Sequence, residues 1–370
     1  MKLKIPVAEP SIGEEELELV SEAVRSGWVS SKGKFIEEFE ENFAKCIGVK
    51  YVIATSNGTS ALHLALTALG FGHKDDVIIP TLTFASVANT IIYTRAKPIL
   101  IDSHPEYWCI NPEKIENKIG KRTKAIIPVH LYGHPCDMDA IMKIAKKHNL
   151  YVIEDCAEAH GAQYKGKMVG SFGDVACFSF YGNKIITTGE GGMCLTSDEE
   201  LAEKMRILRD HGMRPEKRYW HEVVGFNYRM TNLQAALGVA QLRKINTFIR
   251  RKREIAETYN SLLKDIEGLT LPPEMPWAKN VNWLYSILIG EKEFGTSRDK
   301  LMVKLAESGV ETRRFFYPIH TMPPYRKYMG VSSFHVADGL SSCGINLPSS
   351  VKLKEEEIQE VAQLILNAQG

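Results

Sequence analysis

The sequence predicts an α/β protein in which a mostly parallel sheet forms a large domain and a smaller α+β domain follows. Between residues 51 and 198, short apolar runs alternate with segments of helical periodicity. This alternation is typical of βα units around a buried sheet. The length of 370 residues corresponds to about two domains. We expect a large domain over residues 1–250 and a small domain over residues 251–370.

The predicted strands of the large domain are the apolar runs themselves. They are YVIAT, DVIIP, PILID, AIIPV, YVIED, VACFS and MCLTS, which begin at residues 51, 76, 98, 125, 151, 175 and 193. Helical periodicity covers residues 17–24, 61–69 and 138–148. Asn111 followed by Pro112 predicts a further helix that continues to residue 119.

Beyond residue 198 the pattern changes from alternation to long helices. Leu201, Met205 and Leu208 share one helix face, and a longer helical stretch follows Thr231. A group of prolines at residues 272–276 then interrupts the pattern. The strand-like run YSILI and helices that begin near Ser297 and at Lys354 complete the predicted small domain.

Composition narrows the possible partners and the compartment. Lysine and arginine number 46 against 45 aspartates and glutamates, so the net charge of +1 provides no excess for nucleic acid or an anionic membrane. The seven cysteines are scattered singly, which favours a reducing compartment. The N-terminal residues turn acidic where a secretory signal needs an apolar core. We therefore expect a cytoplasmic protein without nucleic-acid or membrane partners.

Polar residues that follow the predicted strands are the candidate ligand-binding groups, because ligands of open α/β sheets bind beyond the carboxyl ends of the strands. Residues 56–60 form a small-residue turn that opens a helix, which suits a phosphate or is simply a helix cap. Asp155 ends a strand, where a buried carboxylate needs a cationic partner, although many such aspartates only cap loops. Glu158, three residues on, returns to the same site if a helix begins there.

Two further candidates follow other strands. Lys184 comes after VACFS and before a glycine cluster, a position where the pKa of its amine can be lowered for covalent catalysis. A surface lysine in a glycine-rich turn is the alternative. Phe84 follows DVIIP, where its face can stack on a flat heterocycle or belong to the core.

A metal site is the competing interpretation of the histidines that follow AIIPV. The residues concerned are His130, His134, Cys136 and Asp137. Their spacing matches no zinc pattern, and Asp137 is well placed to begin a helix, so we expect no metal. The phosphate-loop, nicotinamide and α/β-hydrolase signatures are also absent from the sequence.

Pyridoxal phosphate requires four kinds of group, and the candidates above provide all of them. They are a turn that suits a phosphate, an aromatic side chain, an aspartate at a strand end and a lysine. The segments SNGTSALHLAL, VIEDCAEA, SFYGNKIITTGEGGM and GFNYRMTN occur here in the order found in one family. Over nearly its whole length the chain resembles the DegT/DnrJ/EryC1/StrS family of sugar-nucleotide aminotransferases. The resemblance implies a fold-type I pyridoxal-phosphate-dependent transferase with a three-layer large domain.

The resemblance also implies a role for each candidate. Lys184 would hold the cofactor, Asp155 would pair with the pyridine nitrogen, and both would be catalytic. Phe84 would stack on the ring, and Glu158 would lie near the ring hydroxyl. The residues assigned to the phosphate are Gly58, Thr59, Ser60, Ser179 and, from a neighbouring subunit, Asn227. The last assignment implies a homodimer with shared active sites.

The resemblance further implies the substrates. Glutamate would be the amino donor, and the acceptor would be a 4-keto-6-deoxy sugar nucleotide, in the first place GDP-linked 4-keto-6-deoxymannose for O-antigen synthesis. The candidate substrate-binding residues are Trp28, Ser30, Lys32, Arg313 and His320. Lys184 favours transamination, because the family members that dehydrate the sugar carry histidine there.

Two residues depart from the family's pattern and leave alternatives open. Arg314 stands where proline is usual, and His160 stands where the most similar members carry an apolar residue. A UDP- or dTDP-linked 4-keto sugar is an alternative substrate, because the cofactor motifs are common to the whole family and the nucleotide is read by less regular loops. A non-catalytic regulatory or sensor protein is the alternative from another functional class.

Overall fold

The computed structural model describes residues 4–214, 216–330 and 332–370, and its centre is a seven-stranded sheet of order β1-β9-β8-β5-β4-β2-β3. The strands are β1 (Tyr51–Thr55), β2 (Asp76–Pro80), β3 (Lys97–Ile101), β4 (Thr123–Ile126), β5 (Tyr151–Asp155), β8 (Val175–Ser179) and β9 (Gly192–Thr196). Strand β9 runs antiparallel to β1 and β8, and the other neighbours pair in parallel. The predicted α/β fold with a mostly parallel sheet is therefore confirmed.

The strands are apolar without alternation because the sheet is covered on both faces. Val77, Ile78 and Ile79, three successive residues of β2, are all fully buried. In a strand exposed on one face, every second residue would contact water. The covering helices are α1 (Glu14–Arg25), α2 (Lys34–Ile47), α3 (Gly58–Ala68), α4 (Ser86–Tyr93), α5 (Met138–His148), α6 (Glu199–Arg209) and α7 (Asn232–Arg243).

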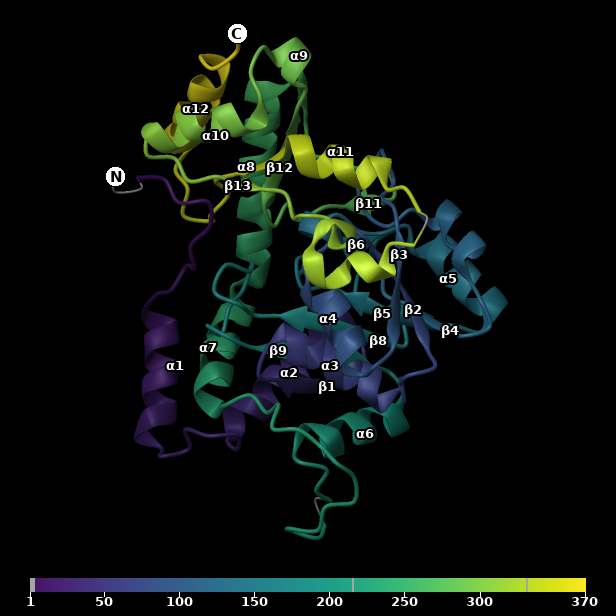
Figure 1. Cartoon of the computed structure of the whole chain (residues 1–370). Helices are drawn as coiled ribbons and strands as arrows, with labels where there is room; N and C mark the ends of the chain where they lie inside the picture. The colour runs from purple at the N-terminus through teal and green to yellow at the C-terminus, as the bar shows by residue number, and fades with distance from the viewer. Residues whose placement is uncertain (1–3, 215, 331) are drawn as a thin grey trace.

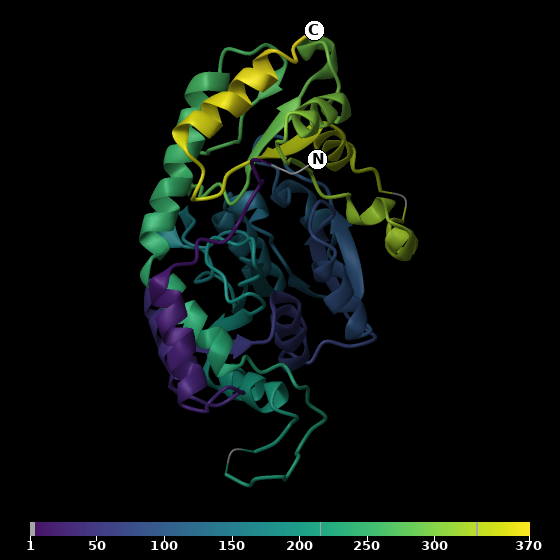
Figure 2. The same ribbon diagram turned by 90° about the vertical axis from the view of Figure 1, so that its left-hand side faces the viewer.

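A smaller unit lies at one end of the large sheet, as both views show (Figures 1 and 2). Its sheet has the order β10-β12-β14-β13. Its elements are α8 (Ile245–Leu263), β10 (Leu269–Thr270), β12 (Tyr285–Ile289), α9 (Glu291–Phe294), α10 (Arg298–Glu307), β13 (Arg313–Arg314), α11 (His335–Cys343), β14 (Gly344–Leu347) and α12 (Glu355–Leu366). A third sheet joins β11 (Ala278–Lys279), β6 (Gln163–Tyr164) and β7 (Lys167–Met168).

Helix α8 passes from one hydrophobic core to the other. Phe248, near its start, packs in the core of the large sheet, whereas Tyr259 packs in a second core. Ile5 also belongs to that second core. We propose that the predicted domain boundary near residue 250 corresponds to this change of core within α8.

Two predicted helices differ from the observed elements. The segment after Asn111 forms two 3-10 turns, Pro112–Lys114 and Glu116–Lys118, in which the N–H groups of Ile115 and Ile119 bond to carbonyls three residues back instead of four. The long stretch after Thr231 is divided into α7 and α8 at Lys244, whose amino group bonds to Glu16. The remaining 3-10 turns are Leu131–Gly133, Ile319–Thr321 and Pro323–Tyr328.

A long segment between α6 and α7 extends away from the body of the protein, at the bottom of both views (Figures 1 and 2). Its exposed residues include Tyr219, Trp220 and Val224. None of the helices in the described ranges is both long enough and apolar enough to cross a membrane.

Candidate active site

A cavity of about 680 Å³ lies at the carboxyl ends of the large sheet and extends to the smaller unit. Most of the residues predicted to contact a cofactor line it. They are Gly58, Thr59, Ser60, Phe84, Asp155, Glu158, Ser179 and Lys184. The topology thus brings the ends of β1, β2, β5 and β8 to one place, as the parallel arrangement requires.

The N-terminus of α3 forms one wall of the cavity. Asn57 caps this helix, since its side chain accepts a hydrogen bond from the backbone N–H of Ser60 at 2.8 Å. In the described part of the chain, the N–H groups of Gly58 and Thr59 have no acceptor. A Cβ atom on Gly58 would stand 2.8 Å from the Cβ of Ser179, so only glycine allows this approach. The helix end and the Ser179 hydroxyl together suit an anion.

Asp155 ends β5 with its carboxylate at the cavity wall. The side chain is 5% exposed, and its Oδ1 accepts a hydrogen bond from the N–H of Ala157 at 3.0 Å. Burial raises the pKa of Asp155, whereas the positive charge of Lys184 opposes that rise. A cationic N–H in the cavity would lower this pKa and stabilise the carboxylate.

Glu158 lies on the same wall and has a different partner. Its Oε2 accepts a hydrogen bond from the N–H of Tyr132 at 2.7 Å. Burial raises the pKa of Glu158 to about 7, although the charge of Lys184 acts in the opposite direction. Glu158 therefore changes charge near neutral pH.

Lys184 reaches the cavity from the loop that follows β8. Burial lowers the pKa of its amine, the negative charges of Glu158 and Asp155 oppose this shift, and Arg313 adds to it. A lysine with a lowered pKa is a better nucleophile and base at neutral pH than an ordinary one.

Phe84 stands at the edge of the cavity with 57% of its surface exposed. Its ring centroid is 5.8 Å from that of Phe316, which also lines the cavity. An exposed aromatic face beside a cavity is favourable when a flat ligand covers it.

The candidate substrate residues are more scattered. Arg313 lines the cavity, as does Arg314. Within the described residues the lining does not include Trp28, Ser30 or Lys32, which are exposed on the loop before α2.

His320 lies outside the described cavity lining and is already bonded at both ring nitrogens. Its Nδ1 lies 2.8 Å from the hydroxyl of Thr81, and its Nε2 lies 3.0 Å from Asp338. These contacts join the end of β2 to α11. The geometry therefore supports a structural role for this side chain.

Asn227 and His160 also lie outside the described lining of this cavity. Asn227 is exposed on the extended segment before α7, where its Oδ1 accepts hydrogen bonds from Arg229. His160 is buried, with its ring 5.2 Å from that of Phe178. Burial lowers the pKa of His160 to about 3, so this histidine is neutral.

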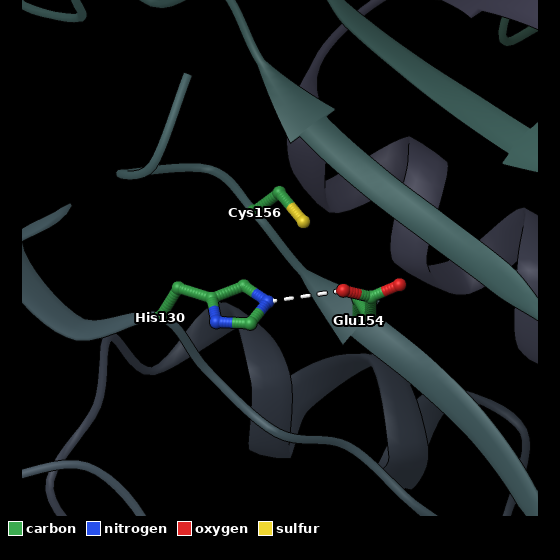
Figure 3. Close-up of side chains that lie close together, drawn as sticks. All are labelled: His130, Glu154 and Cys156. Atoms are coloured by element: carbon green, nitrogen blue, oxygen red, sulfur yellow. Dashed lines mark hydrogen bonds and ion pairs between the residues drawn. The ribbon is translucent and has the colours of Figure 1, made fainter. Parts of the chain in front are cut away.

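His130, Glu154 and Cys156 offer three possible metal-ligand atoms within 4.8 Å of one another (Figure 3). The oxygens of Glu154 already accept hydrogen bonds from His130 Nε2 and from the N–H groups of Gly170, Phe172 and Gly173. His130 Nδ1 accepts from the N–H of Cys136. These hydrogen bonds of Glu154 and His130 join β5 to the loops beside it.

The other residues of the competing metal interpretation have separate local partners. His134 Nδ1 bonds to the carbonyl of Pro135, and Asp137 caps α5 through the N–H of Ala140. The predicted start of the helix at Asp137 is therefore confirmed.

Comparison with known proteins identifies the family. The model of the DegT/DnrJ/EryC1/StrS aminotransferase family matches residues 10–366. The chain belongs to this family. The predicted resemblance is confirmed over nearly the whole chain, and the protein is an aminotransferase-family enzyme.

The relatives include several curated enzymes. GDP-perosamine synthase of Escherichia coli O157:H7 is 48% identical over 98% of this chain and 97% of its own. GDP-perosamine synthase of Caulobacter vibrioides is 46% identical over 97% of this chain and 96% of its own. Among solved structures, Spr1654 of Streptococcus pneumoniae, described as a candidate sugar aminotransferase and solved in its PLP form, has a TM-score of 0.93 at 26% identity, with 99% and 98% of the two chains covered.

The cavity of this family member fits pyridoxal phosphate on three structural grounds. The α3 terminus has free N–H groups where a phosphate would lie, the buried Asp155 is in no ion pair among the described residues although the charge of Lys184 acts on it, and Phe84 has an uncovered face. Without a ligand, and within the described residues, the N–H groups lack acceptors, the buried carboxylate lacks an ion pair, and the aromatic face is exposed to water. A phosphorylated pyridine ring would satisfy all three.

Sequence reasoning missed several residues of the cavity. Tyr132 takes a left-handed conformation (φ 53°) within a 3-10 turn and supplies the N–H that holds Glu158. Trp283 and Asn346 come from the smaller unit. Their contacts with the large domain span long stretches of sequence, and no local pattern indicates them.

Proposed function

We propose that this protein is a pyridoxal-phosphate-dependent aminotransferase that moves the amino group of glutamate to C4 of GDP-4-keto-6-deoxymannose, which gives GDP-perosamine for O-antigen synthesis. The observation that supports this most strongly is the convergence of Lys184, Asp155 and the α3 terminus on one cavity in a chain that is nearly half identical to two GDP-perosamine synthases.

The chain's own residues would hold the cofactor in a fixed orientation. The N–H groups of Gly58 and Thr59 and the hydroxyl of Ser179 would bind its phosphate. Asp155 would accept a hydrogen bond from the protonated ring nitrogen, and Phe84 would cover one face of the ring. When bound, pyridoxal phosphate supplies a carbonyl group that takes up the amino group and a ring that withdraws electrons from the reacting carbon.

Lys184 would act in two roles. Its amine would attach the cofactor in the resting enzyme, and once released it would carry the proton that leaves and rejoins the reacting carbon atoms. Asp155 would remain an anion throughout, because its partner on the ring is a cation. The lowered pKa of Lys184 favours the neutral amine that proton removal needs.

The mouth of the cavity offers positive charge for the nucleotide part of the substrate. Arg313 and Arg314 both line it, and Arg314 is 44% exposed at its side chain. A guanidinium group pairs well with a diphosphate because its planar N–H donors match two oxygens. These two residues would supply the positive charge that a chain with a net charge of +1 otherwise lacks, in competition with Glu311 and Asp299, which lie 3.5 Å from Arg313 and 3.6 Å from Arg314.

We further propose a cytoplasmic homodimer in which each subunit completes the site of the other. Asn227 is exposed on the extended segment before α7, away from the cavity of its own subunit, and exposed apolar residues such as Trp220 and Val224 lie on the same segment. Burial of these residues against a second copy would be favourable. All seven cysteines are free thiols, which suits the cytoplasm.

A panel of 4-keto sugar nucleotides tests the proposed substrate. With glutamate as donor, we expect kcat/KM for the GDP-linked sugar to exceed that for the UDP- and dTDP-linked sugars. A clear preference for a UDP- or dTDP-linked sugar would replace the substrate assignment. A purified protein that shows no visible cofactor band sensitive to borohydride would instead support the non-catalytic alternative.

A further inference from the structure

Trp283 contacts the loop of Lys184 in two ways. The amino group of Lys184 lies 3.7 Å from the centroid of the Trp283 ring. The indole Nε1–H of Trp283 donates a hydrogen bond to the carbonyl oxygen of Asn183, the residue before Lys184, at 2.8 Å. One side chain therefore fixes both the backbone and the amine of the same lysine.

Trp283 is itself firmly placed. It is 3% exposed, and its carbonyl oxygen accepts a hydrogen bond from the buried amine of Lys252 at 2.7 Å. The preceding residue, Asn282, takes a left-handed conformation (φ 46°), and its N–H donates a hydrogen bond to Asn280 Oδ1 at 2.8 Å. The indole is thus held from the smaller unit against the loop that follows β8.

Lys184 rests on this aromatic face and not in an ion pair. Within the described residues the amine forms no ion pair, and Asp155 and Glu158, which line the same cavity, act on it only through their charge. An ion pair in a partly dry cavity would hold the amine tightly and favour its charged form. The face of an indole attracts a cation more weakly and leaves the amine free to move away.

We propose that Trp283 is a positioning residue that receives the amino group of Lys184 whenever this amine is not attached to the cofactor. This inference rests on the proposed function, in which Lys184 is released once in every cycle and must return. The indole keeps the amine beside the reacting atoms, where it can carry a proton and then reattach. A salt bridge with Glu158 would hold it away from that task.

The charged groups that face Lys184 set the sign of the expected effect. Glu158 and Asp155 favour the ammonium form, Arg313 disfavours it, and His160 is neutral. The indole face also favours the ammonium form. Burial is the largest cause of the lowered pKa of Lys184, so an apolar replacement that keeps the amine buried but removes the indole face should lower this pKa further.

Competitive acetylation of the cofactor-free protein across a range of pH, read by peptide mass spectrometry, measures the pKa of Lys184. We expect Trp283→Leu to lower this pKa by roughly half a unit to one unit, and Trp283→Phe to lower it less because a smaller face remains. Trp277→Leu is the matched control, because Trp277 packs against Tyr107 and Tyr164 outside the described cavity lining and should leave the value unchanged.

Equal pKa values in the wild type and both Trp283 variants would overturn the proposal, and so would a higher value in Trp283→Leu. If only Trp283→Phe folds, a Lys184 pKa in this variant equal to that of the wild type would overturn the proposal. Because this measurement uses the protein without cofactor, it is independent of turnover. If only the proposed function is wrong, the protein will not transaminate, but Trp283→Leu will still lower the pKa of Lys184.

Discussion

The carboxylates of Glu154 and Asp155 lie on opposite sides of strand β5. Asp155 lines the cavity, whereas Glu154 is fully buried behind the strand and accepts a hydrogen bond from His130 Nε2 at 3.2 Å. Figure 3 shows the Glu154 side of the strand. Two adjacent acids of similar chemistry thus have different environments, and the difference follows from the alternation of side chains along a strand.

Substitutions of Asp155 and Glu154 should have different effects, the first on turnover and the second on the free energy of unfolding. Asp155→Asn keeps the shape but removes the charge that would face the cofactor ring, so we expect turnover to fall on the order of a hundredfold or more while the free energy of unfolding stays unchanged or rises. Glu154→Gln turns an amide N–H₂ toward backbone donors and should cost about 2–4 kcal/mol of stability. Transaminase kinetics and urea unfolding measure the two effects. Equal losses of stability in the two variants would contradict the assignment.

The close approach of Gly58 to Ser179 predicts a steric effect on cofactor binding. A methyl group at position 58 would meet the Ser179 side chain at 2.8 Å and displace the wall that is proposed to hold the phosphate. We expect Gly58→Ala to raise the Kd for pyridoxal phosphate roughly ten- to a hundredfold.

Gly72→Ala is the matched control for this substitution, because a methyl group there has no neighbour within 4 Å. Titration of the cofactor-free proteins by absorbance measures both Kd values. An unchanged Kd for pyridoxal phosphate in Gly58→Ala would show that the α3 terminus does not bind the phosphate.

Glu158 should make the stability of the cofactor-free protein depend on pH. Burial raises its pKa from 4.5 to about 7, so the folded state holds this proton more tightly than the unfolded state. The stabilisation is present below pH 4.5 and is lost as the pH rises through 7. Relative to Glu158→Gln, we expect the wild type to lose at most about 3 kcal/mol over this interval. Parallel stability curves for the two proteins in urea would show that Glu158 does not titrate there.

The proposed homodimer with shared active sites predicts complementation between two inactive variants. Lys184→Ala and Asn227→Ala each damage every site of a homodimer, but a mixed dimer contains one site with both native residues. Random mixing should restore about a quarter of the wild-type activity, since half of the dimers are mixed and each has one intact site. The test compares the turnover of the two variants refolded together with the turnover of each variant refolded separately. No gain on mixing would place Asn227 outside the partner's site.

The sequence predicted the large sheet well because its strands are continuous apolar runs, such as the fully buried Val77 to Ile79, that end in polar residues. For the same reason, Asp155 and Lys184 could be placed at one edge before any coordinates were known. Trp283 could not be placed, because it reaches the site from the smaller unit through tertiary packing. The prediction of a helix after Asn111 was wrong, although its cap is present, because the backbone hydrogen bonds of that segment close 3-10 turns and not α-helical turns.

Lys184 is proposed to carry out the transamination of a nucleotide sugar. The most direct test incubates wild-type protein and Lys184→Ala with glutamate, pyridoxal phosphate and GDP-4-keto-6-deoxymannose, and detects the amino sugar nucleotide by mass spectrometry. We expect the amino sugar from the wild type only, together with a borohydride-reducible cofactor band that Lys184→Ala lacks. Full activity in Lys184→Ala, or no amino sugar from a wild-type protein that shows this band, would contradict the claim.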